Sequence, residues 1–152
     1  MKKNFLNILT MLLTMAAFWS CSKEMPGGIH EDAMGNPAIR SVIITGAVTD
    51  AQSGQVLEDI TIHFEAYSQN APGTSPLIID EVHTTSKGTY TINVSGVINE
   101  PLLCILTAED GTDAYEGKSN QVNISWRGTS FDRKTGTFVV NDCSFQLNKK
   151  SE

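Results

Sequence analysis

Cys21 is the residue whose position in this chain points most directly to a chemical modification. An apolar stretch over residues 5–18 precedes it, and the polar run Ser22-Lys23-Glu24 follows it at once. Two lysines at the start, an apolar core and a small residue before the cleavage point are the parts of a secretory signal peptide. We therefore expect residues 1–20 to be such a signal and the Cys21 thiol to carry acyl chains, palmitate among them.

The residues around Cys21 resemble the lipobox of Gram-negative lipoproteins, in which the acylated cysteine becomes the first mature residue. The run is Ala16-Ala17-Phe18-Trp19-Ser20-Cys21, in which Phe18 and Trp19 are bulkier than the usual residues. A membrane-spanning anchor is the alternative, but roughly 14 apolar residues fall short of the ~20 that a bilayer requires. The polar run at residues 22–24 also resembles signals of Bacteroidetes-type lipoproteins. The resemblance implies a lipid anchor in the outer membrane, with the protein periplasmic or surface-exposed.

Cys104 and Cys143 are the other two cysteines, and the sequence allows two interpretations of them. In an oxidising periplasm a disulfide between them would stabilise the fold by about 2–4 kcal/mol. Alternatively, both are free thiols buried as small hydrophobic side chains, because each lies in an apolar or alternating run. Neither belongs to a Cys-x-x-Cys motif or has a histidine at metal-ligand spacing, which argues against redox catalysis.

The acidic run Glu109-Asp110-Gly111-Thr112-Asp113 is a weak candidate for a metal site. Ca²⁺ takes several oxygen ligands, and Asp110 and Asp113 would supply them at a glycine turn. The same residue types also form turns readily, which explains the run without a metal. The three histidines, His30, His63 and His83, do not form a ligand set in the sequence. We expect no bound metal or cofactor.

Catalytic motifs are missing from the sequence. It contains neither His-Glu-x-x-His, nor Gly-x-Ser-x-Gly, nor a phosphate-binding glycine loop. Because no nucleophile and base can be named, we expect that the chain is not an enzyme.

Trp126 is the weak candidate for a ligand-binding residue. An aromatic side chain at a strand end, followed here by Arg127, could stack on a sugar or contact a protein. A tryptophan in a β-sandwich is more often a core anchor. An exposed Trp126 would favour binding, and a buried one would count against it.

The charge and length of the chain restrict its partners and its organisation. Removing residues 1–20, which hold two lysines and no acid, leaves nine basic and seventeen acidic residues and a net charge of −8. Such a chain repels the phosphates of nucleic acids, so we expect no nucleic-acid partner. The remaining 132 residues suit a single domain.

Residues 21–40 have the composition of a flexible tether, with three glycines, two prolines and few apolar side chains. Residues 41–152 show a period of two and recurring turn signals, which predict short strands. We place them at Ser41–Thr49, Asp59–Tyr67, Leu77–Thr85, Thr89–Ser95, Pro101–Ala108, Gln121–Trp126 and Thr137–Leu147. This spacing predicts an all-β fold, a seven-stranded antiparallel sandwich of the Ig-like or prealbumin-like kind.

For two of these segments the sequence predicts how many faces of the strand are buried. Ile60, Ile62 and Phe64 share one face of their strand with polar residues between them, so one face should pack inward. Residues 102–106 are apolar throughout, which predicts a central strand covered on both faces.

The first half of the domain resembles the carboxypeptidase regulatory-like, or transthyretin-like, β-sandwich module. The resemblance rests on Ile44-Thr45-Gly46-Ala47-Val48-Thr49-Asp50, on residues 53–62, and on the hairpin Thr84-Thr85-Ser86-Lys87-Gly88-Thr89-Tyr90. Gly54 and Gly88 suit turn positions with positive φ. Asp59 stands where the family usually has glycine. The resemblance implies an accessory β-sandwich with a binding or spacer role.

Taken together, these features predict a lipid-anchored, non-enzymatic accessory or binding module at the cell envelope that presents a β-sandwich to another protein. One alternative is a glycan-binding lipoprotein of a polysaccharide-utilisation system. Another is an adhesin or assembly subunit that uses an open sheet edge for strand addition.

The lipid anchor can be tested by metabolic labelling. We expect radiolabelled palmitate to be incorporated into the wild-type chain and not into the Cys21→Ala variant, because the thiol is the acceptor in this hypothesis. Labelling should be read on the protein after gel separation. A Cys143→Ala variant serves as the control, and label that persists in Cys21→Ala would contradict the hypothesis.

Overall fold

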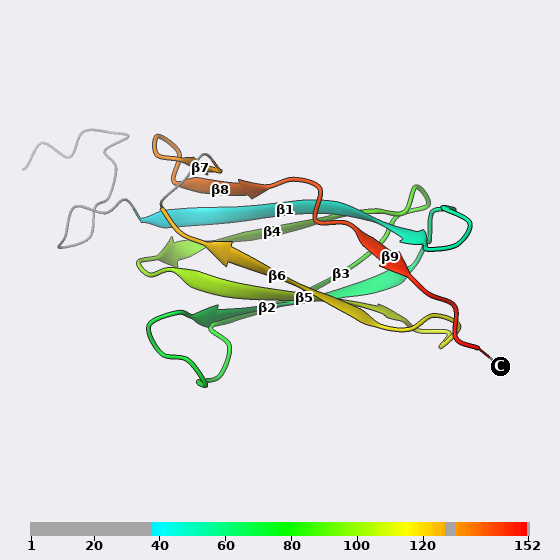
Figure 1. Cartoon of the computed structure of the whole chain (residues 1–152). Helices are drawn as coiled ribbons and strands as arrows, with labels where there is room; N and C mark the ends of the chain where they lie inside the picture. Colours follow the sequence, from blue (N-terminus) through cyan, green and yellow to red (C-terminus); the bar gives the residue numbers. More distant parts are fainter. Residues whose placement is uncertain (1–37, 127–129, 152) are drawn as a thin grey trace, which may run out of the picture.

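The computed structural model describes residues 38–126 and 130–151, which form two facing β-sheets (Figure 1). The strands are β1 (Ile39–Asp50), β2 (Ile60–Ser68), β3 (Ile78–His83), β4 (Thr89–Ile98), β5 (Leu102–Asp110), β6 (Lys118–Ile124), β7 (Phe131–Asp132), β8 (Thr137–Val140) and β9 (Phe145–Leu147). The predicted all-β sandwich is confirmed. In the part of the chain that is described, no helix is long and apolar enough to cross a membrane.

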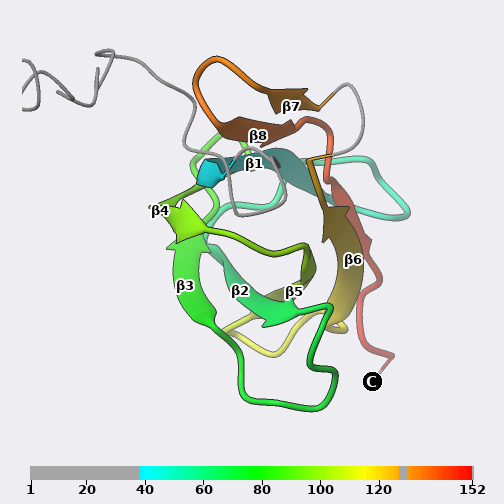
Figure 2. The same ribbon diagram turned by 90° about the vertical axis from the view of Figure 1, so that its left-hand side faces the viewer.

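The first sheet is organised around β1. Its order is β4-β1-β8-β7, and β9 also pairs with β1, beyond the end of β8. β4 is antiparallel to β1, whereas β8 and β9 are parallel to it. The second sheet has the order β3-β2-β5-β6 and is antiparallel throughout. Strands β3 and β4 therefore form the edges of the two sheets on the same side of the sandwich, as Figure 2 shows.

The strand count differs from the prediction at the carboxyl end. The segment predicted as one strand, Thr137–Leu147, is two, β8 and β9, because Asp142 adopts a positive φ of 62° and breaks the extended backbone. β7 is a two-residue strand that the sequence pattern did not predict. The first strand also begins slightly earlier than predicted, since β1 starts at Ile39, and Ala38 before it is buried.

The core lies between the two sheets and is made of alternating side chains. Ile60, Ile62 and Phe64 of β2 point inward and are buried, as the period-two pattern predicted. β5 is central in its sheet, but Leu103 and Ile105 lie on its outer face and are only half-buried. The expectation that residues 102–106 are covered on both faces is therefore wrong, because no strand of residues 38–126 and 130–151 forms a second layer over the outer face of this sheet.

The turns before β2 and β4 have the conformations expected from the sequence. Gly54 and Gly88 adopt positive φ values of 71° and 70°, as predicted. Asp59 does so too, with φ of 59°, at the position where the resembled family carries glycine. An aspartate tolerates this left-handed conformation better than most residues, which explains how the turn survives the replacement.

The segment that joins β8 to β9 approaches the backbone of β1 closely, on the side of β1 opposite β4. The Cys143 N–H donates to the Thr45 carbonyl over 2.9 Å, and the buried Tyr90 hydroxyl donates to the Cys143 carbonyl. A Cβ built on Gly46 would overlap the Cys143 carbonyl and lie 2.8 Å from the Tyr90 ring. Only glycine at position 46 lets the chain pass this close, because every other residue carries a Cβ.

Several sequence-based expectations concern residues outside the described ranges. These are the signal peptide at residues 1–20, the lipidated Cys21, most of the tether, His30 and Arg127.

The crossing at Gly46 gives a stability prediction. We expect Gly46→Ala to lower the free energy of unfolding by about 3 kcal/mol, because the methyl group overpacks a site with no room to relax. The measurement is equilibrium unfolding in urea. Gly111→Ala is the matched control, since a Cβ there meets no atom within 4 Å and the backbone φ is not positive. Equal destabilisation of the two variants would contradict the prediction.

Candidate binding surface

The two cysteines of the domain are free thiols, and both are buried. Cys104 lies on β5 of the second sheet, whereas Cys143 follows β8 beside β1 of the first. Burial raises the pKa of the Cys104 thiol to about 12, so it stays protonated at neutral pH. Of the two interpretations that the sequence allowed, the structure agrees with the one in which both cysteines are buried free thiols.

The acidic loop is organised by its own hydrogen bonds. The Asp110 carboxylate accepts hydrogen bonds from the backbone N–H groups of Thr112, Ala114 and Tyr115. The Asp113 carboxylate instead contacts the Lys150 ammonium. Within residues 38–126 and 130–151, no group of three or more His, Cys, Asp or Glu is arranged to hold a metal ion. The weak candidates Asp110 and Asp113 thus act here as turn-forming and ion-pairing residues.

Asp50 anchors the same end of the sandwich. Its carboxylate accepts hydrogen bonds from the backbone N–H groups of Ser53 and Gln52, each over 2.8 Å, and from the Tyr115 hydroxyl over 3.0 Å. These bonds stabilise the ionised form, with those from the Ser53 and Gln52 backbone the strongest, and lower the pKa of Asp50 to about 2. The loop after β1 is therefore tied to the loop after β5.

His63 and His83 lie on the outer face of the second sheet among carboxylates. His63 is 3.0 Å from Glu81 and 3.4 Å from Glu109, and His83 is 3.6 Å from Asp59. All of these side chains are at least 40% exposed, so each pair contributes little to stability. The structure places both histidines on the surface, and for His63 the alternation of β2 indicated this position.

Trp126 follows β6 and is half-buried, with its side chain packed against the core. This packing fits the role of a core anchor better than that of an open platform for a sugar. Trp126 is therefore not part of the surface described below.

Two of the three large apolar side chains that are exposed among the described residues lie at the start of β3, and the third, Val56, lies beside the end of β1. Ile79 is 70% exposed and Leu77, just before the strand, is 53% exposed. β3 is an edge strand that pairs with β2, and no described strand pairs with its other side. Large apolar residues on an open edge invite pairing with another chain, which most proteins avoid. We call the segment Leu77–His83 and its unpaired side the β3 edge.

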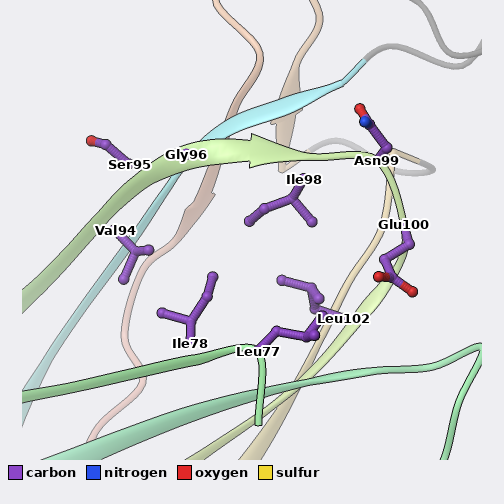
Figure 3. A pocket seen from close by; sticks show the side chains of 9 residues that line it. All are labelled: Leu77, Ile78, Val94, Ser95, Gly96, Ile98, Asn99, Glu100 and Leu102. Atoms are coloured by element: carbon purple, nitrogen blue, oxygen red, sulfur yellow. The ribbon is translucent and has the colours of Figure 1, made fainter.

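A slot opens beside the β3 edge, between the two sheets (Figure 3). Its volume is about 450 Å³. Aliphatic side chains from both sheets point into it, and Glu100 stands at its end, where its carboxylate accepts the Ser68 hydroxyl. It is lined by Leu77, Ile78, Val94, Ser95, Gly96, Ile98, Asn99, Glu100 and Leu102. Part of the space is open because Gly96 has no side chain, and a Cβ there would meet nothing within 4 Å.

A second hollow, of about 400 Å³, lies on the outer face of the second sheet. The half-buried Leu103 and Ile105 line it together with Tyr67, and the loop after β2 overhangs it with Pro72 and Gly73. The Gln69 amide bridges this hollow to β5 and β6, donating to the Leu102 carbonyl and to the Asn123 side chain. On the outer face, Glu65 of β2 lies between Ile79 and Ile105, so this hollow is separate from the β3 edge.

Sequence reasoning did not identify the β3 edge or the slot. The apolar pair at residues 78 and 79 is typical of an ordinary buried strand, but Ile79 is exposed because it lies on the outer face of an edge strand. Two signals were available. One was the continuous apolar run at residues 102–106, because a strand that is buried on one face needs apolar residues only at every second position. The other was Gly96, because a glycine inside a strand often marks a close approach of another backbone.

Comparison with known proteins gives a fold likeness and no family. No family model matches the chain, and no curated protein matches it either. Among solved structures, 3-chlorocatechol 1,2-dioxygenase from Rhodococcus opacus 1CP has a TM-score of 0.48 and 17% identity, over 73% of this chain and 61% of that one. The major plantain pollen allergen has a TM-score of 0.48 and 15% identity, over 74% and 96%. The pilus 2b backbone protein of group B streptococcus has a TM-score of 0.42 and 14% identity, over 74% and 42%.

These comparisons correct one expectation. From the missing motifs we expected that the chain is not an enzyme, but the similar structures include catechol 1,2-dioxygenases and (S)-allantoin synthase, which are enzymes. The expectation is therefore wrong, because a sandwich of this kind is compatible with an enzymatic role. The chain spans 53–61% of the lengths of these dioxygenases, and at these identities and TM-scores the likeness assigns none of their chemistry to it.

The Asp50 contacts predict a pH dependence of stability. Because the folded-state pKa lies below the ordinary value of 3.8, the stabilisation is complete above about pH 4 and is lost as the pH falls toward about 2. We expect Asp50→Asn to flatten this part of the curve of unfolding free energy against pH. Urea unfolding at a series of pH values gives the measurement. An unchanged slope in the variant would contradict the role of Asp50, and Asp142→Asn is the control.

Proposed function

We propose that this protein is a lipid-anchored module of the cell envelope that binds another envelope protein through the β3 edge. Cys21 carries the acyl chains in this proposal, and the segment up to residue 37 spaces the sandwich from the membrane. More than one acyl chain makes such an anchor stable, whereas a single chain binds only marginally. The outer membrane is the proposed location, on the resemblance of residues 16–24 to lipoprotein signals.

The exposed pair Leu77 and Ile79 on an unpaired edge is the observation that carries the binding part of the proposal. In strand addition, an extended segment of a partner pairs with a free edge and places alternate side chains in pockets. The β3 edge offers backbone groups that no described strand pairs with, and the slot beside it offers a pocket of suitable chemistry. An accessory β-sandwich of the carboxypeptidase regulatory-like kind would serve this role, although that family remains a resemblance of the sequence.

A glycan-binding role has less support in the structure. The aromatic residue that suggested it, Trp126, packs against the core. In the hollow on the outer face, the Gln69 amide is already occupied by bonds within the protein. The side chains of Leu103 and Ile105, which line this hollow, suit an apolar group better than a hydroxyl-rich sugar.

The proposal is tested by site-specific photo-crosslinking in the native envelope. A photoreactive amino acid at position 79 should form adducts with one envelope protein, and mass spectrometry should place the crosslink in one segment of that protein. Position 121 is the matched control, because Gln121 is an exposed residue on β6, the opposite edge strand of the same sheet. Adducts from position 121 alone, from both positions equally, or from neither would contradict the proposal.

A further inference from the structure

A side chain of β3 itself, that of Asp80, occupies a backbone group on the unpaired side of the strand. The Thr84 N–H donates to the Ile60 carbonyl of β2 over 2.9 Å, and in an antiparallel strand every second residue turns its backbone groups the same way. Val82, Asp80 and Ile78 therefore face β2, and the backbone groups of Ile79, Glu81 and His83 face the open side. The Glu81 N–H on that side donates to the Asp80 carboxylate over 2.9 Å.

Asp80 is thus a charged residue placed to discourage strand addition. It belongs to the same face of β3 as Ile78 and Val82, which pack against the core, and it lies opposite the fully buried Phe64 on β2. An inward-pointing charge on an edge strand is a known device against unwanted pairing. A partner strand that took the Glu81 N–H would release the Asp80 carboxylate, which then needs a new partner of positive charge.

The side chains along β3 give the pattern that a partner must match. From the slot end they are two aliphatic residues, Ile78 and Ile79, then two acids, Asp80 and Glu81, then Val82. Cross-strand neighbours stabilise a sheet when they are apolar together or opposite in charge, and like charges directly opposite destabilise it. No lysine or arginine occurs between Leu77 and His83.

We infer that the partner segment accepted by the β3 edge is an extended strand that carries two adjacent basic residues next to two aliphatic ones. The basic pair lies against Asp80 and Glu81, and one aliphatic side chain enters the slot beside Ile78. This inference rests on the proposed function and names the chemistry of its partner. A second copy of this chain is the wrong occupant, because the antiparallel registers that pair most of β3 with itself are centred on Asp80 or on Glu81 and set that acid directly against its own copy.

The test measures binding of a fluorescent peptide, Ser-Val-Ile-Lys-Lys-Ile-Val-Ser, to the full lipidated chain in detergent by anisotropy at 0.15 M salt. Its core reads the same in both directions, so parallel and antiparallel addition are both allowed. We expect binding at least about fivefold tighter than that of the peptide with Glu-Glu in place of Lys-Lys. A same-composition peptide with the lysines at its ends, and one with alternate amides N-methylated, should also bind at least fivefold more weakly.

Protein variants separate local recognition from overall charge. In the double variant Asp80→Lys with Glu81→Lys, the preference should invert toward the Glu-Glu peptide. The double variant Glu58→Lys with Glu116→Lys is the matched control, because it changes the net charge equally at two exposed sites outside β3. Leu77→Lys should weaken binding of the Lys-Lys peptide, whereas Val56→Lys, at an equally exposed aliphatic residue beside the end of β1, should not.

Each other outcome overturns the inference in a distinct way. Equal effects of the two double variants would mean that only bulk charge matters, and equal binding of the N-methylated peptide would rule out backbone pairing. Self-association abolished by Asp80→Lys would identify a second copy as the occupant. If no peptide binds while position 79 still crosslinks to an envelope protein, the chemistry inferred for the partner is wrong and the proposed function stands.

Discussion

The approach of the Cys143 carbonyl to Gly46 is the contact on which the rest of this sandwich depends. It occurs where β1 exchanges one parallel neighbour, β8, for another, β9. The Tyr90 hydroxyl, which β4 supplies, donates to the same carbonyl, so that β1, β4 and the connection between β8 and β9 meet at a single backbone group. Phe145 and Leu147 of β9 are buried, and they can reach the core only because the chain crosses β1 so closely at this point.

One end of the sandwich is closed by contacts between loops and the other is open, and this difference bears on function. At the Asp50 end, the loops after β1 and β5 are joined through Tyr115, and Lys150 near the carboxyl end contacts Asp113. At the opposite end, the sheets part between β3 and β4 and leave the slot, with aliphatic side chains at its mouth. Apolar surface left open at one end of an otherwise closed sandwich is characteristic of an interaction site.

Much of the fold could be predicted because its information is local. The alternation of Ile60, Ile62 and Phe64 identified β2 and its buried face, and Gly54 and Gly88 identified turns with positive φ. The parallel pairing of β8 and β9 with β1 could not be predicted, because strands 96 residues apart carry no local sign of their neighbours. The binding surface was missed for a related reason, since Ile79 looks like any core residue until β3 is known to be an edge.

The arrangement of the first sheet also dictates when this protein can fold. β1 is the first strand of the sandwich, yet Ser41 pairs with Thr137 and Asp50 pairs with Leu147. Such distant pairings give a high contact order, and proteins with high contact order fold slowly. During synthesis β1 remains without its parallel partners until β8 and β9 have emerged. The sandwich therefore closes only after both strands have been made, and without β9 the end of β1, from Val48 to Asp50, would lack its parallel partner.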